Sequence, residues 1–242
     1  MKMKLIIIDW AGYPLFRNKD LLLYRLSCGL APLFKSMDTM DAGTPFSVTL
    51  VINDGRPEQQ AIYKRLMDRY DWITDLLFRD NVGQDFGAYQ AGYQSCLDEG
   101  YDGEIAFLNT SIKGPVTDGW LLAHHNAFNA KTNLGVYGLS MDSHYGIPAN
   151  IFSPHVQSYF LYTTISILKS VFPEGLPGIK ETDRKQIINK GEVGFSSAML
   201  NAGYGISCAQ YPDLIYRKDD PWTYPVGSGR FKPLNMAKSH QL

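Results

Sequence analysis

The chain has 242 residues, of which 45% are hydrophobic and 19% are charged, and its formal net charge is -1 at pH 7. This length allows one large domain with a sizeable core, and a nearly neutral chain without runs of Lys or Arg argues against a dedicated nucleic-acid binder. The three cysteines are far apart and form no CxxC pair, which is typical of reduced thiols in a cytoplasmic protein.

The first half of the chain alternates predicted strands with predicted helices. Continuous apolar runs, of the kind buried on both faces of a parallel sheet, predict strands over Leu5–Asp9, Phe46–Ile52, Trp72–Phe78 and Glu104–Asn109. Helical spacing of apolar residues predicts helices over residues 20–34 with Asp20 as the N-cap, 56–70, 84–99 and 120–129. This alternation is typical of an α/β sandwich with a mainly parallel sheet.

The second half of the chain is less regular. It is expected to contain, in order, a strand over residues 134–139, a long loop over 143–157, helices over 158–172 and 192–203, and a short strand over 204–209. From residue 211 onward, turn residues and aromatics predominate and periodicity is weak. We therefore expect one domain over residues 1–242 with an irregular C-terminal extension over 211–242.

Polar residues follow each of the four predicted strands of the first half. They are Asp9 and Trp10, Asn53 and Asp54, Asp80 and Asn81, and Asn109, Thr110 and Ser111. Any one of these groups is explained by turns and helix caps. Ligands of open α/β sheets bind outside the carboxyl ends of the strands, so four such ends at one edge indicate a polar ligand.

Three glycines and a carboxylate gather in the stretch that follows the third strand, "RDNVGQDFGAYQAGY" over residues 79–93. Its spacing does not match the G-x-G-x-x-G dinucleotide fingerprint, and the chain has no GxxxxGK[ST] loop. HExxH, GxSxG and metal-type Cys/His spacings are also missing from the sequence. The motif therefore indicates neither a dinucleotide site nor a P-loop.

Four blocks of the sequence resemble bacterial glycosyltransferases related to the rhamnan synthesis protein F family. They are "RDNVGQDFGAY", "YDGEIAFLNTSIKGP", "SPHVQSYF" and "EVGFSSAMLNAGYGIS". The first two are fairly specific as a pair, and the last resembles the acidic-residue-then-helix element of GT-A-type glycosyltransferases. The resemblance implies a GT-A fold with a nucleotide-sugar-binding half over residues 1–140 and an acceptor-side half over 141–210.

The resemblance also implies which residues bind the donor. Asp9, Trp10, Asn53 and Asp54 would lie near the base and ribose, and the residues near the ribose, diphosphate and sugar would be Arg79, Asn81, Gly83, Asp85 and Gly87. Glycine allows backbone to approach a ligand closely, and a helix N-terminus offers free N–H groups. For Asp85 two interpretations stay open, because it could bind sugar hydroxyls or cap the following helix.

One departure from the GT-A pattern concerns the metal. Most GT-A enzymes carry Asp-x-Asp after the fourth strand, where the carboxylates hold Mg²⁺ or Mn²⁺, but this chain has Asn109, Thr110 and Ser111 there. Amide and hydroxyl oxygens bind a hard divalent ion more weakly than carboxylates. Either the enzyme is metal-independent, with Arg79, Lys113 or helix N-termini offsetting the diphosphate, or a carboxylate from elsewhere supplies the ligand. We favour metal independence, and Lys113 can equally be an ordinary surface lysine.

An inverting transfer, which the resemblance suggests, needs a general base beside the acceptor hydroxyl. Glu192 is the first candidate because it heads the fourth block, and Asp142 and His155 are the second choices for the base. Asp85 is expected as a second catalytic carboxylate. A glutamate at a helix start is also common for electrostatic reasons alone. The residues expected on the acceptor side are Asp142, His155, Gln157 and Ser158, of which Ser158 could instead form a cap or turn.

The resemblance predicts a glycosyltransferase of bacterial polysaccharide synthesis. Its partners would be a UDP-, TDP- or GDP-linked hexose or deoxyhexose and a glycan acceptor, with a lipid-linked acceptor as an option. Two alternatives stay open: a sugar nucleotidyltransferase-like enzyme and a non-catalytic glycan- or nucleotide-binding module. No stretch approaches 18 apolar residues, so we expect a cytoplasmic protein, either free or peripheral at the inner membrane face.

Overall fold

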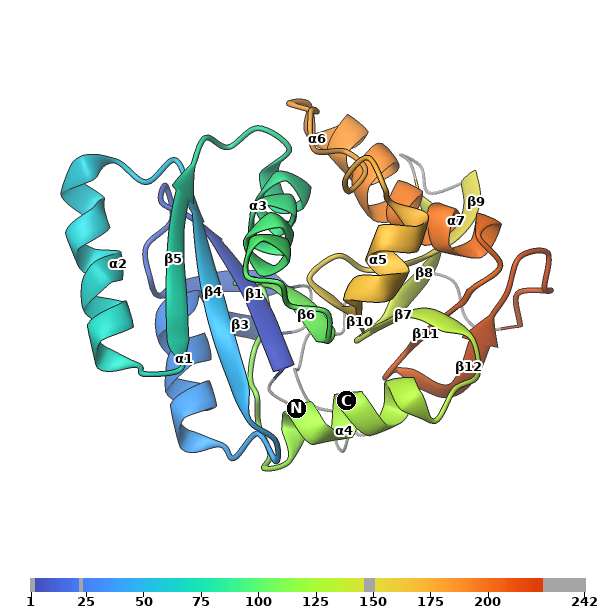
Figure 1. The fold of residues 1–242 in the computed structure, drawn as a ribbon, viewed down its shortest axis with the longest axis horizontal. Helices are drawn as coiled ribbons and strands as arrows, with labels where there is room; N and C mark the ends of the chain where they lie inside the picture. Colours follow the sequence, from blue (N-terminus) through green and yellow to red (C-terminus); the bar gives the residue numbers. More distant parts are fainter. Residues whose placement is uncertain (1–2, 22–23, 146–150, 224–242) are drawn as a thin grey trace.

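The computed structural model describes residues 3–21, 24–145 and 151–223. Its centre is an eight-stranded sheet in the order β12-β11-β7-β10-β6-β1-β4-β5, with helices on both faces (Figure 1). Four of its seven strand pairings are parallel, and three are antiparallel. The predicted α/β sandwich with a mainly parallel sheet is confirmed.

The first half of the chain supplies the parallel part of the sheet. Its strands are β1 (Met3–Trp10), β4 (Phe46–Asn53), β5 (Ile73–Arg79) and β6 (Glu104–Asn109). The apolar run of β1 is buried along its whole length up to Asp9. Leu5 and Ile7 face one hydrophobic core, whereas Ile6 and Ile8 face the other, because successive side chains of a strand point to opposite faces.

The second half adds strands of mixed direction. They are β7 (Leu134–Gly138), β10 (Phe160–Thr164), β11 (Gly205–Cys208) and β12 (Tyr211–Tyr216). β10 runs antiparallel to both β6 and β7. The helix predicted over residues 158–172 is therefore wrong in its first part, and only α5 (Ile165–Val171) is helical there. The aromatic and β-branched residues of β10 suit a strand buried on both faces. Because such a run is apolar throughout, its hydrophobic periodicity does not distinguish a strand from a helix.

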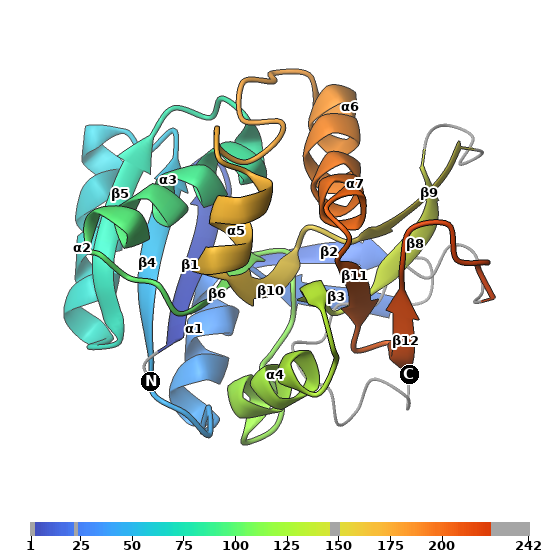
Figure 2. The ribbon, with the colours of Figure 1, turned by 45° about the vertical axis from the view of Figure 1, so that its right-hand side comes forward.

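The helices form a layer on each face of the sheet, as Figure 2 shows. The layer that packs on Leu5 and Ile7 contains α1 (Leu30–Thr39), α2 (Pro57–Arg69) and α4 (Trp120–Asn129). The layer on Ile6 and Ile8 contains α3 (Gln84–Asp98), α5 and α7 (Gly194–Asn201). Two short helical elements lead into α7, namely α6 (Arg184–Gln186) and the π-helix η1 (Ile187–Val193). None of the helices in these described residues is both long and apolar enough to cross a membrane.

The helix predicted from Asp20 to residue 34 is wrong in its first part. Residues there form a two-stranded antiparallel hairpin of β2 (Arg17–Leu21) and β3 (Tyr24–Cys28), and α1 begins only at Leu30. Gly29 separates the two with a φ of 113°. A Cβ at Gly29 would lie 2.4 Å from the carbonyl oxygen of Leu15, so the chain turns there in a conformation that L side chains rarely adopt.

The long loop predicted over residues 143–157 is also largely replaced by strands. β8 (Met141–Tyr145) and β9 (Ile151–Val156) pair as a second antiparallel hairpin, while residues 146–150 lie outside the described residues. Pro154 stands within β9, which is compatible with a two-stranded ribbon because proline is tolerated where its missing N–H is not needed. In the chain, residues 153–156 of this hairpin lead directly to Gln157 and Ser158.

One buried side chain makes the fold sensitive to acid. His124 of α4 is fully buried, and neither of its ring nitrogens has a hydrogen-bond partner among the described residues. Its ring packs 4.6 Å from the ring of Phe160. Burial lowers the pKa of His124 from 6.5 to about 3, because the charged imidazolium would lose its hydration without gaining a partner.

We expect His124→Phe to weaken the loss of stability at low pH. Below pH 6.5 the unfolded chain binds a proton at His124 that the folded chain excludes down to about pH 3, so stability falls as pH falls through this window. Between pH 7 and 5 this linkage amounts to about 2 kcal/mol. Urea unfolding at both pH values should show that much less loss in the variant than in the wild type. His144→Phe serves as the matched control, and equal pH slopes for all three proteins would refute the assignment.

Candidate functional site

Two adjoining clefts open at the carboxyl ends of the parallel strands. These strand ends lie toward the top of Figure 1. The central cleft has a volume of 610 Å³ and lies among the ends of β1 and β6, the start of α3, and η1. The side cleft has a volume of 720 Å³ and lies among the loop after β1, the turn after β4 and the end of β5. Trp10 lines both clefts.

Most of the site residues predicted from the sequence line these clefts. Those at the central cleft are Asp9, Trp10, Asn53, Asn81, Asp85, Asn109, Ser111, Gln157, Ser158 and Glu192. Those at the side cleft are Trp10, Asp54 and Arg79. The predicted residues outside both linings are Gly83, Gly87, Lys113, Asp142 and His155.

A buried carboxylate forms the floor of the central cleft at the end of β1. Asp9 is 4% exposed, accepts a hydrogen bond from Thr110 and lies 3.4 Å from a guanidinium nitrogen of Arg17. The same guanidinium donates to Thr110 over 2.8 Å. Burial raises the pKa of Asp9, although hydrogen bonds from Thr110 and Arg17 and the charge of Arg17 oppose this effect. The second oxygen of Asp9 has no partner among the described residues, so a polar acceptor faces this end of the sheet unsatisfied.

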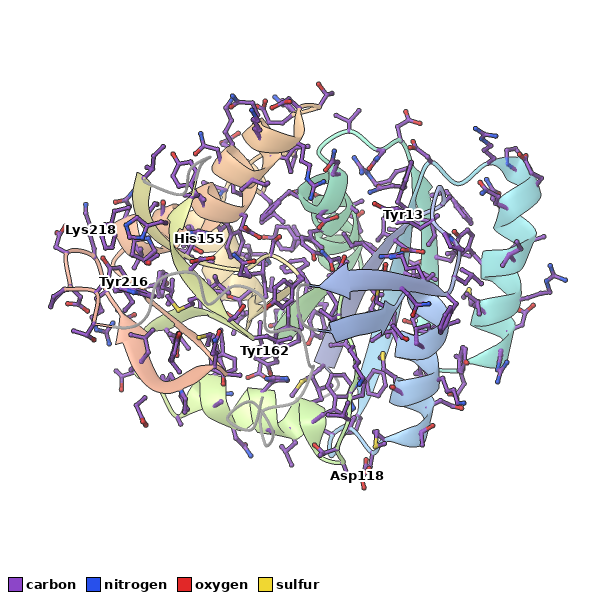
Figure 3. The ribbon with its side chains drawn as sticks, turned by 180° about the vertical axis from the view of Figure 1, so that it is seen from behind. Tyr13, Asp118, His155, Tyr162, Tyr216 and Lys218 are labelled. Atoms are coloured by element: carbon purple, nitrogen blue, oxygen red, sulfur yellow. The ribbon has the colours of Figure 1, made fainter. Side chains whose placement is uncertain are left out.

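The loop after β1 is fixed to the turn after β4 by an indole–carboxylate contact. Trp10 donates its Nε1–H to Asp54 over 2.8 Å, and the other oxygen of Asp54 accepts from the backbone of Asn81 over 3.1 Å. Trp10 also packs edge-on against Tyr13, with ring centroids 4.8 Å apart. Figure 3 shows Tyr13 near the upper edge of the strands. The guanidinium of Arg17 lies 4.3 Å from the centre of the Tyr13 ring, so the aromatic wall of the clefts is held in place by a cation–π contact.

Arg79 holds two neighbouring segments together. Its guanidinium donates to the Asn53 side chain and to the Val82 carbonyl, both over 2.6 Å. Burial lowers the pKa of Arg79, and the charges of Asp80 and Asp54 partly oppose this. With two of its donors already used, the side chain links β4 to the loop before α3.

Two of the three glycines of the motif, Gly83 and Gly87, serve packing in the described structure. Gly83 has a φ of 74°, and a Cβ there would lie 2.5 Å from the carbonyl oxygen of Ile179. A Cβ on Gly87 would lie 2.1 Å from the Val82 carbonyl oxygen and 2.6 Å from a guanidinium nitrogen of Arg79. Both glycines are therefore required by close contacts within the protein, and a contact with the donor stays a prediction.

Asp85 connects the start of α3 to the end of β6. It lies in the first turn of the helix, where the dipole favours a carboxylate, while the N-cap itself is Gly83. Its Oδ2 accepts from the Asn109 amide over 2.8 Å, and the amide oxygen of Asn109 accepts from the backbone of Ser111 over 2.9 Å. Most GT-A enzymes carry an Asp-x-Asp motif after this strand. Here the end of β6 instead supplies Asn109, which pairs with Asp85 of α3.

Glu192 faces this pair from the other side of the central cleft, on the π-helix η1. Its Oε2 accepts from the backbone N–H of Ser158 over 2.6 Å, and its side chain is 14% exposed. The Tyr89 hydroxyl donates to the Ser158 carbonyl over 2.8 Å. Burial raises the pKa of Tyr89 well above its usual value. Gln157 and Ser158 lie just before β10, so the antiparallel strand brings them to the same edge as the ends of β1 and β6.

Three predicted residues take places apart from the clefts. Lys113 is exposed and lines neither cleft, which agrees with an ordinary surface lysine. Asp142 lies on β8 opposite His155 of β9. His155 is buried behind Glu192, with its Nε2 at 3.7 Å from Oε1 of the carboxylate.

Sequence reasoning missed several residues that line the central cleft: Tyr13, Arg17, Gln84, Tyr159, Arg184 and Ile188. Arg17 was missed because the segment after it was interpreted as a helix that leads away from the sheet. Arg184 belongs to a polar stretch with no motif. Proximity to the acidic-residue-then-helix block was the one available signal for Arg184 and Ile188.

The donor set of the central cleft does not fit a divalent metal held by protein ligands alone. Three carboxylates line it, from Asp9, Asp85 and Glu192, and each already accepts a hydrogen bond from the protein. Among the described residues no group of three or more His, Cys, Asp or Glu side chains gathers as metal ligands would. A dedicated site for Mg²⁺ or Mn²⁺ would bring several oxygen ligands together.

Two solved structures share the fold. A mannosyltransferase, PcManGT from Pyrobaculum calidifontis in complex with GDP-Man and Mn²⁺, matches with a TM-score of 0.54 and 9% identity over 86% of this chain and 54% of its own. TarS of S. aureus matches with a TM-score of 0.53 and 12% identity over 86% of this chain and 35% of its own. The chain thus spans about half the length of the first and about a third of the second, and at these identities the likeness shows the fold alone.

The comparison of sequences is more specific. No curated protein matches the chain. The family model described as rhamnan synthesis protein F matches residues 49–216, which is more than half of the chain and includes the motif after β5, the end of β6 and Glu192. The blocks that carried the resemblance are therefore parts of one continuous match, and the chain belongs to the rhamnan synthesis protein F family.

Proposed function

We propose that the chain is a glycosyltransferase of bacterial polysaccharide synthesis, which moves a sugar from a nucleotide-sugar donor to a hydroxyl of a glycan acceptor. The observation that carries this proposal is the pair of adjoining clefts at the carboxyl edge of the parallel strands, within a chain of the rhamnan synthesis protein F family. Ligands of open α/β sheets bind at this edge. We place the reaction in the cytoplasm or at the inner face of the membrane.

The side cleft suits the nucleotide of the donor. Trp10 is 37% exposed and offers an aromatic face, and Asp54 offers carboxylate oxygens beside it. An aromatic ring stacks on any base, and a carboxylate accepts from base or ribose donors. Gln59 donates to the Ala11 carbonyl over 2.9 Å, which fixes the backbone on the far wall of the cleft.

The central cleft suits the sugar and the diphosphate. It combines the polar ends of β1 and β6 with apolar side chains, which are Ile8, Phe86, Ile187 and Ile188. A 6-deoxyhexose has hydroxyls for the polar side and a methyl group for the apolar side. The word rhamnan in the family's description names a polymer of such a sugar, and we propose a nucleotide-linked deoxyhexose as the donor.

Glu192 is the general base in this proposal, and Asp85 binds donor hydroxyls on the opposite wall. The carboxylate of Glu192 takes the proton of the acceptor hydroxyl as the hydroxyl oxygen bonds to the anomeric carbon. The bond between that carbon and the diphosphate oxygen breaks, and the nucleoside diphosphate leaves with the electron pair. This one-step displacement inverts the anomeric configuration.

Arginine side chains offset the charge of the leaving diphosphate in place of a metal. Arg17 and Arg184 line the central cleft from the β1 side and the η1 side. Arg184 is exposed and has no ion pair among the described residues. A guanidinium binds phosphate oxygens through two parallel hydrogen bonds. In this proposal the two arginines therefore neutralise the diphosphate without a metal ion and without the carboxylate ligands that such an ion would need.

A nucleotide sugar should stabilise the folded chain, whereas a free sugar should not. A ligand at a hundred times its Kd adds about 2.7 kcal/mol of stability, which for a chain of this size raises Tm by several degrees. Thermal shifts with UDP-, TDP- and GDP-linked hexoses and deoxyhexoses would rank the donors. We expect the largest shift with a nucleotide-linked deoxyhexose and a smaller one with Trp10→Ala. A lack of response to the whole panel would overturn the proposal.

Glu192→Gln should lower kcat by about 100-fold or more with little change in donor affinity, since the amide keeps its shape but cannot take a proton. Asp85→Asn should instead raise the KM for the donor. Transfer is measured as release of nucleoside diphosphate in the presence of a glycan acceptor. Turnover of Glu192→Gln near the wild-type rate would remove Glu192 from the base role. Donor binding without turnover in the wild type would favour a non-catalytic module.

The rate of sugar transfer should be unchanged in EDTA. Arg184→Gln should weaken donor binding about tenfold, because the variant loses one charge-assisted contact at an exposed position. The control is Lys185→Gln, because Lys185 is the exposed neighbour of Arg184 and lies outside both clefts. Activity that EDTA abolishes and Mn²⁺ restores would contradict the metal-independent mechanism.

A further inference from the structure

We propose that the side cleft selects guanine, so that the donor of the proposed reaction is a GDP-linked sugar. This inference rests on the proposed function because it names the nucleotide at the same site, but binding of the base can be measured without any transfer. The cleft has a volume of 720 Å³ and lies beside the ends of β4 and β5, which meet near the top of Figure 1. Pockets of this volume hold small organic ligands, and a nucleoside is a ligand of that size.

Two aromatic rings give the side cleft flat apolar surfaces. Trp10 is 37% exposed, and Phe78 is partly buried at the end of β5. Each ring packs against a glycine, because a Cβ at Gly12 would lie 2.4 Å from the Trp10 ring and a Cβ at Gly55 would lie 2.4 Å from the Phe78 ring. A base stacks on an aromatic ring whatever its identity, so these rings favour a base without choosing which one.

Most polar side chains of the side cleft are already engaged within the protein. Each carboxylate oxygen of Asp54 accepts a hydrogen bond, one of them from the indole N–H of Trp10. The side-chain oxygen and nitrogen of Gln59 are both hydrogen-bonded to backbone groups. Both terminal nitrogens of Arg79 donate to the protein. Each of these groups would have to share or give up an internal contact in order to distinguish one base from another.

Asp80 and Arg56 are the remaining charged side chains of the cleft lining, and both are exposed. Neither forms an ion pair, with the other or with any other described residue. Within the same residues the Asp80 carboxylate accepts no hydrogen bond, and the Arg56 guanidinium donates none. The side cleft therefore offers a ligand one free carboxylate and one free guanidinium.

Guanine is the base whose edges match this pair of side chains. Its N1–H and its exocyclic N2–H₂ are adjacent donors, which a carboxylate accepts through both of its oxygens. Its O6 and N7 are adjacent acceptors, which a guanidinium approaches with two donors. We assign the donor edge to Asp80 and the acceptor edge to Arg56.

The same carboxylate disfavours the other bases. Uracil and thymine offer one imide N–H between two carbonyl oxygens, so one oxygen of Asp80 would face a second acceptor. Adenine and cytosine place an acceptor ring nitrogen beside their amino group, which creates the same conflict. A wrong ligand that leaves polar groups unpaired or opposed binds more weakly, and this difference is the basis of selectivity.

Binding of nucleoside diphosphates to the full chain tests this choice without any sugar. Isothermal titration calorimetry would compare GDP, IDP, ADP, UDP and TDP. We expect GDP to bind tightest, with UDP and TDP weaker by about tenfold or more. IDP lacks only the 2-amino group of GDP, so it should also bind about tenfold more weakly, the effect of one charge-assisted hydrogen bond. Equal affinities for GDP and IDP, or tighter binding of UDP or TDP, would overturn the proposal.

Variants at the two exposed positions test which side chain recognises which edge. Asp80→Asn should weaken GDP binding and bring the affinities of GDP and IDP within about twofold, because the amide can no longer accept from both donors. Arg56→Gln should weaken GDP and IDP by the same factor, since both keep O6 and N7. The matched control is Asp71→Asn, because Asp71 is exposed and lines neither cleft. A wild-type preference for GDP over IDP in Asp80→Asn would refute the assignment of Asp80.

The two proposals fail in distinguishable ways. If the chain transfers sugar from a UDP- or TDP-linked donor and binds GDP weakly, the proposed function stands and the choice of guanine is wrong. If GDP binds with the expected preference but no nucleotide sugar is consumed, the side cleft is a guanine site and the proposed transfer is wrong. Failure of every nucleoside diphosphate and every nucleotide sugar to bind would overturn both.

Discussion

Every side chain of the site is positioned relative to β1, which is buried on both faces and hydrogen-bonded to strands on both sides. Its register with β4 runs to Trp10, which lies opposite Asn53, and its register with β6 runs to Ile8, which lies opposite Asn109. A one-residue slip would move every side chain of the strand to the opposite face. Because Ile6 and Ile8 pack into one core and Leu5 into the other, such a slip would disrupt both cores at once. The positions of the polar strand ends therefore depend on the packing beneath them.

The polar groups at this edge contact one another before any ligand arrives. Trp10 bonds to Asp54, Asn109 bonds to Asp85, and Ser158 bonds to Glu192, and each contact joins segments that are distant in the sequence. Such contacts remove rotamer freedom from groups that a ligand would otherwise have to order, which is the physical content of preorganisation. The free oxygen of Asp9 is the exception, since it is buried without a partner among the described residues.

The sequence predicted a strand or helix correctly where the signal lay within that element itself. The apolar run of β6 and the helix beginning at Pro57 appear as predicted, because continuous apolar runs and N-terminal prolines carry their own structural meaning. The β2–β3 hairpin could not be predicted, since Gly29 turns the chain through a contact with Leu15 that depends on the tertiary structure. Arg17 was missed because the segment after it was interpreted as a helix, and because its partner Thr110 lies 93 residues away. The resemblance, rather than periodicity, identified Glu192.

The reversed direction of β10 gives the two sides of the site different architectures. Strands that run with β1 reach the site at their carboxyl ends, whereas β10 leaves it at its amino end, so Gln157 and Ser158 arrive from the β8–β9 hairpin rather than from a strand of the parallel sheet. One wall is thus built from loops anchored in the parallel sheet, and the other from a separate ribbon and a π-helix. Changes in the ribbon can reshape the second wall without altering the register of the first. Under the proposed function, this separation would let the acceptor wall vary while the donor wall stays constant.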